Sequence, residues 1–201
     1  MARYCLDFMC LHTSKFEFIK PKIISALFIR KSQILEMIAL SNKRYGYILI
    51  SDRKWWNRLC KRHEYNDRNY VFVRRNRVGP CEAHKLFFYV KKPVMQIRGV
   101  ADFVERLTGN HKELWKAYGH ETCLKTFNEY TNFLQGRQIA TFIRFTDLNE
   151  FMNPIPARIM YRILGTSRVP RGGKYLNRET VNQLTVGRRS QVGKVQPKGF
   201  R

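Results

Sequence analysis

Acidic residues are scarce in this chain. Its 201 residues include 15 Asp and Glu against 38 Lys and Arg, which leaves a formal net charge of +23 at pH 7. A balance so far from neutral favours a polyanionic partner, either a nucleic acid or an anionic membrane surface. The excess is uneven, since residues 51–98 and 165–201 are strongly basic while residues 99–164 are nearly neutral. This distribution predicts a molecule with one cationic face and one plain face.

Long apolar runs are also missing. The longest, IISALFI at residues 23–29, is far shorter than the ~20 residues that a membrane-spanning helix needs. The N-terminus lacks the pattern of a secretory signal, because Asp7 and His12 interrupt its apolar stretch. These features argue against membrane insertion and secretion, and they leave nucleic acid as the favoured polyanion.

Cysteine pairs and metal-ligand motifs are lacking too. The five cysteines are odd in number and form no CxxC pair, as expected of reduced thiols in a cytoplasmic protein. Cys60 and His63 lie three residues apart, but no second pair matches them. We therefore predict a cytoplasmic protein with no metal and no cofactor.

Common catalytic signatures are not found in the sequence. It contains no GxSxG, HExxH or P-loop pattern. The segment PRGGKY at residues 170–175 has two glycines flanked by Arg171 and Lys174, and such glycines let backbone amides approach an anion. An anion site and a plain turn both remain open for this segment. A binding protein is favoured over an enzyme.

Aromatic and β-branched residues concentrate in short stretches that predict strands. These stretches are residues 45–50, 70–73, 85–90, 94–100 and 138–145. Capping residues and apolar spacing predict helices after Ser51 and Asp52 and at residues 112–118, 125–134, 156–164 and 177–184, whereas residues 102–107 are expected to be helical or irregular. Because the central strands follow one another through short loops, a doubly wound parallel fold is disfavoured. The order predicts an α+β fold with a strongly bent, mostly antiparallel, barrel-like sheet and helices at its rim.

The ends of the chain differ from this central part. Residues 1–41 form an N-terminal extension with helical spacing of apolar residues, or else sequence upstream of a true start at Met37. Residues 42–185 are predicted to form one domain. Residues 186–201 are rich in Gly, Arg and Lys without an apolar period, which is typical of a basic disordered tail.

Several motifs resemble one superfamily. YGYILISDRKWW at residues 45–56 resembles the opening of EVE and related PUA-like domains, where a strand ends in a serine and the next helix carries a tryptophan. HKLFFYVKKPVMQIRGVADF at residues 84–103 is similar to a strand pair of the same domains. Together with the later VPRGGKYL, the likeness covers about residues 45–185 and looks most like an archaeal branch of the PUA/ASCH/EVE superfamily.

This resemblance implies a PUA-like (EVE/ASCH-type) bent mixed β-barrel with peripheral helices, here with basic terminal extensions. It also implies binding of RNA or of a modified base. Ser51 and Trp55 fall where EVE domains line their pocket, and Gly99 falls on the strand glycine. Because this chain is far more basic than a typical EVE domain, a broad contact with the nucleic-acid backbone is favoured over a simple base pocket.

The candidate binding residues follow from charge and ring chemistry. Cations on loops and sheet rims contact phosphates, and the candidates are Arg74, Arg75, Arg77, Lys91, Lys92, Arg98, Arg171 and Lys174. Aromatic rings stack on unpaired bases, and the candidates for stacking or for a pocket are Ser51, Trp55, Trp56 and Tyr175. Adjacent residues on a helix cannot point the same way, so we expect Trp55 in the core or a pocket wall and Trp56 exposed.

The predicted function is binding of structured RNA, ribosomal or transfer RNA, with the ribosome as one candidate partner. One alternative is a reader of a modified base in DNA or RNA. Another is a small nucleoside or amide hydrolase of the ASCH type, which uses a lysine-centred site. No such site can be placed from the sequence, because Lys85 and Lys112 lack a diagnostic context.

Overall fold

The computed structural model describes residues 39, 42–63, 69–168 and 172–186. The predicted extension at 1–41 and the predicted tail at 186–201 lie outside the described residues, apart from a few positions at their inner ends. Arg171, a candidate phosphate contact, also lies outside them.

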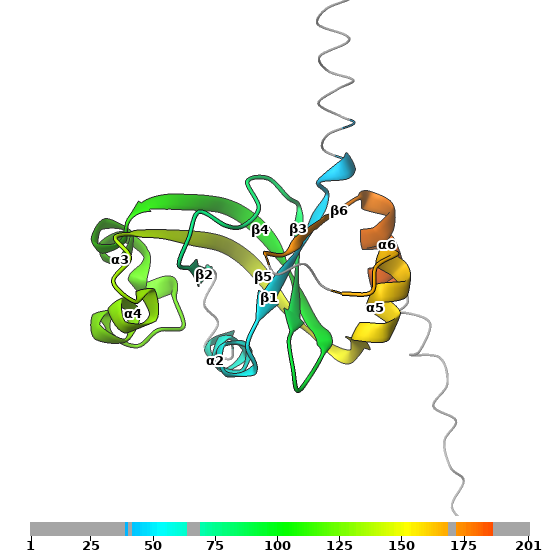
Figure 1. Cartoon of the computed structure of the whole chain (residues 1–201), viewed down its shortest axis with the longest axis horizontal. Helices are drawn as coiled ribbons and strands as arrows, with labels where there is room; N and C mark the ends of the chain where they lie inside the picture. The colour runs from blue at the N-terminus through cyan, green and yellow to red at the C-terminus, as the bar shows by residue number, and fades with distance from the viewer. Residues whose placement is uncertain (1–38, 40–41, 64–68, 169–171, 187–201) are drawn as a thin grey trace, which may run out of the picture. The chain divides into compact units, whose positions relative to one another are not determined.

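Residues 42–186 contain one mixed six-stranded sheet with the order β2-β5-β4-β3-β1-β6 (Figure 1). Neighbouring strands are antiparallel except for β1 and β3, which run parallel. The α+β class and the mostly antiparallel sheet are therefore confirmed. The strands are β1 (Gly46–Ser51), β2 (Tyr70–Arg74), β3 (Lys85–Val90), β4 (Gln96–Asn110), β5 (Ile139–Pro156) and β6 (Lys174–Leu176).

The predicted barrel is not closed. Strands β2 and β6 are the two edges of the sheet, and β6 pairs only with Gly46, Tyr47 and Ile48 of β1. The second half of β1 therefore faces β2 across a gap. The guanidinium of Arg74, at the end of β2, crosses this gap and donates from Nη2 to the carbonyl oxygen of Ile50 at 3.1 Å.

Strands β4 and β5 are much longer than the sequence predicted. The stretch 102–107, expected to be helical or irregular, continues β4, and β5 runs on past residue 145 to Pro156. Their pairing shifts register at three places, between Ile97 and Gly99, Val100 and Asp102, and Phe103 and Glu105. Each irregularity interrupts the two-residue alternation of side chains by which a strand is recognised, so the prediction of residues 102–107 was wrong.

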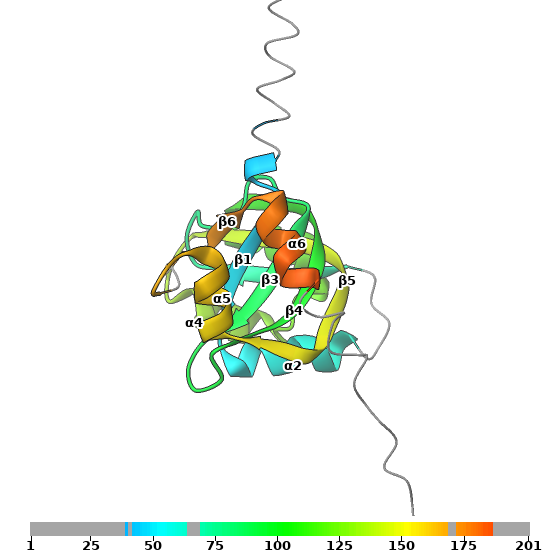
Figure 2. The same ribbon diagram turned by 90° about the vertical axis from the view of Figure 1, so that its right-hand side faces the viewer.

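The α-helices of the described residues occupy the predicted segments, with ends displaced by a few residues, whereas the 3₁₀ helix was not predicted. They are α2 (Arg53–His63), α3 (His111–Tyr118), the short 3₁₀ helix η1 (Gly119–Glu121), α4 (Phe127–Leu134), α5 (Ala157–Leu164) and α6 (Arg178–Val186). Helices α3 and α4 lie at the far end of the β4–β5 pair (Figure 1), and α5 and α6 lie side by side over the opposite part of the sheet (Figure 2). No helix among the described residues has the length and apolarity needed to cross a bilayer.

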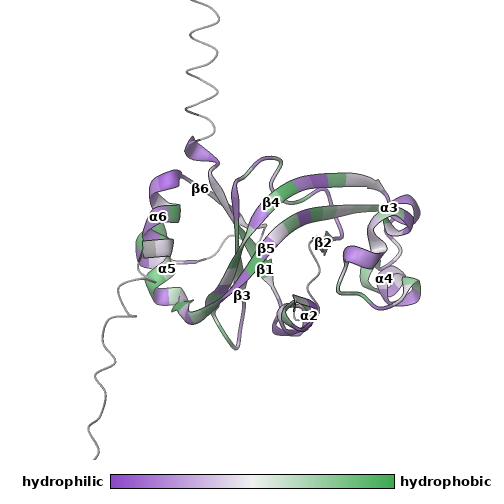
Figure 3. Ribbon diagram, turned by 180° about the vertical axis from the view of Figure 1, so that it is seen from behind, coloured by the Kyte–Doolittle hydropathy of each residue, from purple (hydrophilic) through white to green (hydrophobic). Residues whose placement is uncertain are grey.

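Three apolar clusters hold these helices to the sheet. Leu59 of α2 packs with Phe88 and Phe145, Met160 of α5 packs with Phe87, and a third cluster lies beneath α3 and α4. The helices carry hydrophilic and hydrophobic residues together (Figure 3), as expected where one face is buried and the other is wet. The first cluster includes residues of β1 and β2, so a packed core holds the two strands that border the gap.

Candidate nucleic-acid interface

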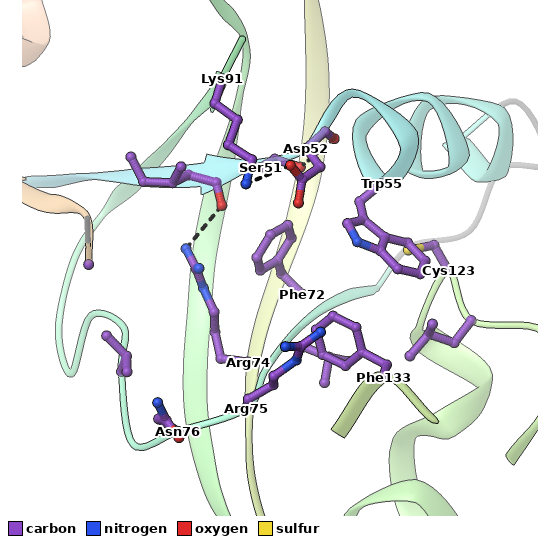
Figure 4. Close-up of a pocket in the computed structure, with 15 residues that line it drawn as sticks. Ser51, Asp52, Trp55, Phe72, Arg74, Arg75, Asn76, Lys91, Cys123 and Phe133 are labelled. Carbon is purple, nitrogen blue, oxygen red and sulfur yellow. Dashed lines mark hydrogen bonds and ion pairs between the residues drawn. The ribbon is translucent and has the colours of Figure 1, made fainter. Parts of the chain in front are cut away.

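A cleft of about 580 Å³ lies where the sheet fails to close (Figure 4). Its walls come from the end of β1, from β2 and the loop that follows it, from the start of α2, and from the segments around Cys123 and α4. The lining residues are Ile50, Ser51, Asp52, Trp55, Phe72, Val73, Arg74, Arg75, Asn76, Val78, Lys91, Cys123, Leu124, Phe133 and Gly172.

Three half-buried aromatic rings form part of this lining: Trp55, Phe72 and Phe133. Trp55 and Phe133 meet edge to face with ring centroids 5.6 Å apart. Phe72 lies between Arg74 and Trp55 in the close-up (Figure 4). Partly exposed rings around a cleft of this size offer faces on which an unpaired base can stack.

Arg74 places a partly desolvated positive charge in the cleft. Burial lowers the pKa of its guanidinium, and nearby Tyr47 and Asp52 offset this only in part. Its Cζ lies 5.1 Å from the centroid of the Phe72 ring, and its buried Nε has no hydrogen-bond partner. Among the described residues, no carboxylate forms an ion pair with Arg74. The guanidinium therefore brings a positive charge without a carboxylate partner to the cleft wall, which suits a ligand that carries hydrogen-bond acceptors or negative charge.

Two other cations line the cleft from different elements. Arg75 donates from Nη1 to Oε1 of Gln135 at 2.8 Å, and its Cζ lies 4.8 Å from the centroid of the Phe133 ring. Lys91 Nζ lies 2.8 Å from Oδ1 of Asp52. The backbone N–H of Lys91 also donates to the carbonyl oxygen of Ser51, the residue before Asp52, at 3.0 Å.

The structure brings together five candidate residues from three separate segments of the sequence. Ser51, Trp55, Arg74, Arg75 and Lys91 all line the cleft. Arg77 lines a neighbouring cavity that shares Arg75 with the cleft. The end of β2, with Arg74 and Arg75, and the turn that begins at Lys91 therefore meet at this cleft.

Other candidates lie elsewhere. Arg98 donates from Nη2 to Oε1 of Glu150 at 2.9 Å, on the β4–β5 pair. Lys174 reaches the carbonyl oxygen of Leu164 at 3.5 Å. Neither these two residues nor Lys92 lines the cleft.

Tyr175 is a packing residue on β6 and not part of the cleft lining. Its ring meets Tyr47 edge to face at 4.9 Å, and its hydroxyl accepts a hydrogen bond from Cys81 N at 2.8 Å. The ring of Tyr175 is also covered by Arg44, whose Cζ lies 5.3 Å from the centroid. Its predicted place in a pocket is therefore not found in this cleft.

Of the two adjacent tryptophans, Trp55 lines the cleft, within the range of positions expected for it, whereas Trp56 does not lie where it was expected. Trp56 is 3% exposed and packs against Phe88 with ring centroids 5.4 Å apart, so the prediction that it is exposed was wrong. Trp56 and Leu59 lie three residues apart on α2 and both face the core. Trp55 is turned away from that face, towards the cleft.

One wall of the cleft is held by an ion-pair network that the sequence did not reveal. Arg144 of β5 donates from Nε and Nη2 to the two carboxylate oxygens of Glu121, each at 2.8 Å, and from Nη1 to Glu105. Its Cζ also lies 4.6 Å from the centroid of the Tyr118 ring. These bonds raise the pKa of Arg144 above its usual range. They tie η1, and with it the segment leading to Cys123, to the sheet.

The cleft contains little that points to nucleophilic chemistry. Burial raises the pKa of the Cys123 thiol to about 11, so at neutral pH this wall residue is protonated. Among the described residues, no three His, Cys, Asp or Glu side chains are grouped so that they could hold a metal ion.

Comparison with known proteins bears on the fold. No family model and no curated protein matches the chain. Similar solved structures are those of an ASCH protein from Zymomonas mobilis and two of its point mutants, with TM-scores of 0.58 to 0.59 and 19 to 20% identity. The alignments cover 71 to 72% of this chain and 95 to 98% of the ASCH chains. They do not support an archaeal branch. They show that the chain has the fold of an ASCH domain, as the PUA/ASCH/EVE resemblance implied.

Proposed function

We propose that this protein binds RNA, and that the cleft between β1 and β2 holds an unpaired base. The observation that carries the proposal is Arg74, a partly buried guanidinium that has no carboxylate ion pair among the described residues and lies among aromatic rings of the cleft lining. A base supplies a flat surface for Trp55 and Phe72, and the acceptor atoms of the base or of its phosphate can accept hydrogen bonds from the guanidinium of Arg74.

The charge of the whole chain supports the same ligand. A net charge of +23 draws a polyanion to the surface, and the release of counterions from phosphates contributes much of the affinity. Unpaired bases in loops of structured RNA, such as ribosomal or transfer RNA, can turn out of a stack and enter a cleft. Such loops are the ligand class that we propose, with the ribosome as one place where they occur.

The experiment that tests this function is a binding titration of fluorescently labelled RNA hairpins, followed by anisotropy at several salt concentrations. We expect affinity to fall steeply with salt. Arg75→Gln and Lys91→Gln should each weaken binding by about tenfold, the loss expected for one charge-assisted contact.

Lys92→Gln is the matched control, because Lys92 adjoins Lys91 and is exposed but does not line the cleft. It should change affinity by less than about threefold. Equal losses for Lys91→Gln and Lys92→Gln would show that the cleft is not the binding site. Absence of RNA binding at low salt would refute the function itself.

The same titration separates a general RNA binder from a reader of a modified base. Ser51 is 3% exposed at the cleft, and its Oγ donates to Asp52 O at 3.2 Å. A reader would bind modified oligonucleotides far more tightly than plain ones, and Ser51→Ala or Trp55→Ala would abolish this discrimination. Equal affinity for modified and plain strands favours the general binder.

The hydrolase alternative is compatible with one observation, the pairing of Lys91 with Asp52 inside the cleft. A lysine beside a carboxylate is a component of lysine-centred sites, although this pair is half exposed. Incubation of the purified protein with acetylated cytidine, followed by chromatography, tests this function. Product formation that Lys91→Gln abolishes would establish a hydrolase, and no product would exclude this reaction.

A further inference from the structure

Two further cavities adjoin the cleft, one on each side. The first, of about 670 Å³, lies between α2 and the segment from α3 to Lys125, and it shares Cys123 and Leu124 with the cleft. The second, of about 370 Å³, lies beside the loop after β2 and shares Arg75 and Asn76 with the cleft. Because each flanking cavity shares wall residues with the cleft, the three cavities are neighbours with the cleft in the middle, and we call this row the three-cavity path.

The three-cavity path is cationic along its length. The larger flanking cavity is lined by Arg58, Lys61, Arg62, Lys116 and Lys125. The smaller one is lined by Arg75, Arg77 and Arg137. Among the described residues, Asp52 in the central cleft is the one carboxylate in the three linings.

The cations of the larger flanking cavity divide into two groups. Arg58 pairs with Glu129, and Arg62 donates from Nη1 to Thr122 O at 2.6 Å, so these two residues hold the cavity wall together. Lys61, Lys116 and Lys125 are exposed at the cavity. These three ammonium groups come from α2, from α3 and from the residue before the N-cap of α4, yet they meet at one hollow.

The chemistry changes along the path. The central cleft combines cations with three half-buried aromatic rings. In the larger flanking cavity, the ring of Trp115 is already stacked on Tyr130 with centroids 4.8 Å apart. The smaller flanking cavity has no aromatic residue in its described lining. A base therefore fits the centre, while the two flanks fit phosphates.

We propose that the ligand is a single strand of RNA that runs along the three-cavity path. One base is held in the central cleft, and the phosphates on either side of it lie in the flanking cavities. This inference rests on the function proposed above and specifies how much of the strand is bound. A duplex fits the path poorly, because its bases are stacked and paired and cannot reach the rings of the cleft.

The test measures how affinity depends on strand length. Labelled oligouridylates from about 3 to about 12 nucleotides, within the range of known single-strand site sizes, are titrated with the full-length protein. We expect affinity to rise with length until the strand spans the path and then to level off. The triple variant Lys61→Gln, Lys116→Gln, Lys125→Gln should weaken binding of the longest strand by about tenfold or more and reduce the salt slope by about 2.

The matched control removes the same charge elsewhere. Arg158, Arg162 and Arg168 are exposed and line none of the three cavities. Their triple substitution by Gln should leave the affinity for the longest strand within about threefold of wild type. Circular dichroism verifies that both variants fold, as expected for substitutions of exposed side chains.

The outcomes separate this inference from the proposed function. If both triple variants lose affinity for long strands equally, the binding path is overturned while the cleft remains an RNA site. The same conclusion follows if affinity does not rise with strand length. If the wild-type protein binds no RNA of any length, both proposals fail. Deoxyuridylates of the same lengths show whether the path distinguishes RNA from DNA.

Discussion

The indole of Trp56 lies directly against the backbone of Gly99. A β-carbon at Gly99 would come within 2.6 Å of Cη2 of Trp56 and within 2.7 Å of the carbonyl oxygen of Asn149. The absence of a side chain at this position on β4 therefore allows α2 to dock on the sheet. Because α2 also carries Trp55, this packing positions one wall of the cleft.

Gly99→Ala should lower the free energy of unfolding by about 1–3 kcal/mol, the usual cost of overpacking a core. Urea denaturation measures it. Gly109→Ala is the control on the same strand, because a β-carbon there meets nothing within 4 Å, and it should change stability by less than about 1 kcal/mol. Equal losses for both variants would contradict the packing described here.

Replacement of the two adjacent tryptophans by alanine should affect different properties of the protein. Trp55→Ala should weaken RNA binding by about 1–3 kcal/mol, the range for one stacked base, with a smaller effect on stability. Trp56→Ala should lower the free energy of unfolding by about 3–5 kcal/mol, because it empties a core site. Anisotropy and urea denaturation measure the two effects. A folded Trp55→Ala protein with unchanged affinity would remove Trp55 from the site.

Glu129 links stability to pH. The backbone N–H of Lys125, together with Arg58, lowers the pKa of this carboxyl group below its usual value. A lowered folded-state pKa stabilises the protein above the unfolded pKa of about 4.3, and this contribution is lost as pH falls through the folded value. Glu129→Gln should therefore cost about 0.5–1 kcal/mol at pH 7, and the difference from wild type should disappear well below about pH 4.

Urea denaturation across this pH range measures the effect. Glu113→Gln is the control, since Glu113 is an exposed glutamate in the first turn of α3. Its effect on the free energy of unfolding at pH 7 should be smaller than that of Glu129→Gln. A cost for Glu129→Gln that stays constant down to the lowest pH would contradict the lowered pKa.

The thiol of Cys123 should react slowly with alkylating reagents. Since burial raises its pKa to about 11, its thiolate is a small fraction at pH 8. Iodoacetamide at pH 8 should therefore modify the exposed Cys81 at least tenfold faster than Cys123, as read from peptide masses. In denaturant the two rates should converge. Equal rates in the folded protein would show that the thiol is not shielded.

The sequence located most elements because their signals are local. Strand β3 is a continuous apolar run, and the N-cap of α4 follows the capping pattern of Thr126 and Glu129, whose N–H donates to Thr126 Oγ1 at 3.1 Å. Strand β4 beyond residue 101 was missed because its register shifts break the alternation of side chains. The polar residues there are satisfied by distant partners, as Glu105 is by Arg144.

The site was predictable only in part, for a related reason. Charge and ring chemistry marked Trp55, Arg74 and Lys91, but nothing local showed that Phe72 and Phe133 complete their wall. Which of two adjacent tryptophans faces the core depends on where α2 docks, and docking is a long-range property. The larger flanking cavity was missed because its lysines come from three separate segments.

The open edge of the sheet has a consequence for the protein without its ligand. Strand edges that no neighbour covers are templates for pairing between molecules, and here the second half of β1 and the adjacent part of β2 border a cleft in place of a neighbouring strand. Under the proposed function, a nucleotide bound in the cleft would occupy this gap and, by mass action, should raise the melting temperature. A ligand in the cleft should thus also protect the protein from self-association through this open edge.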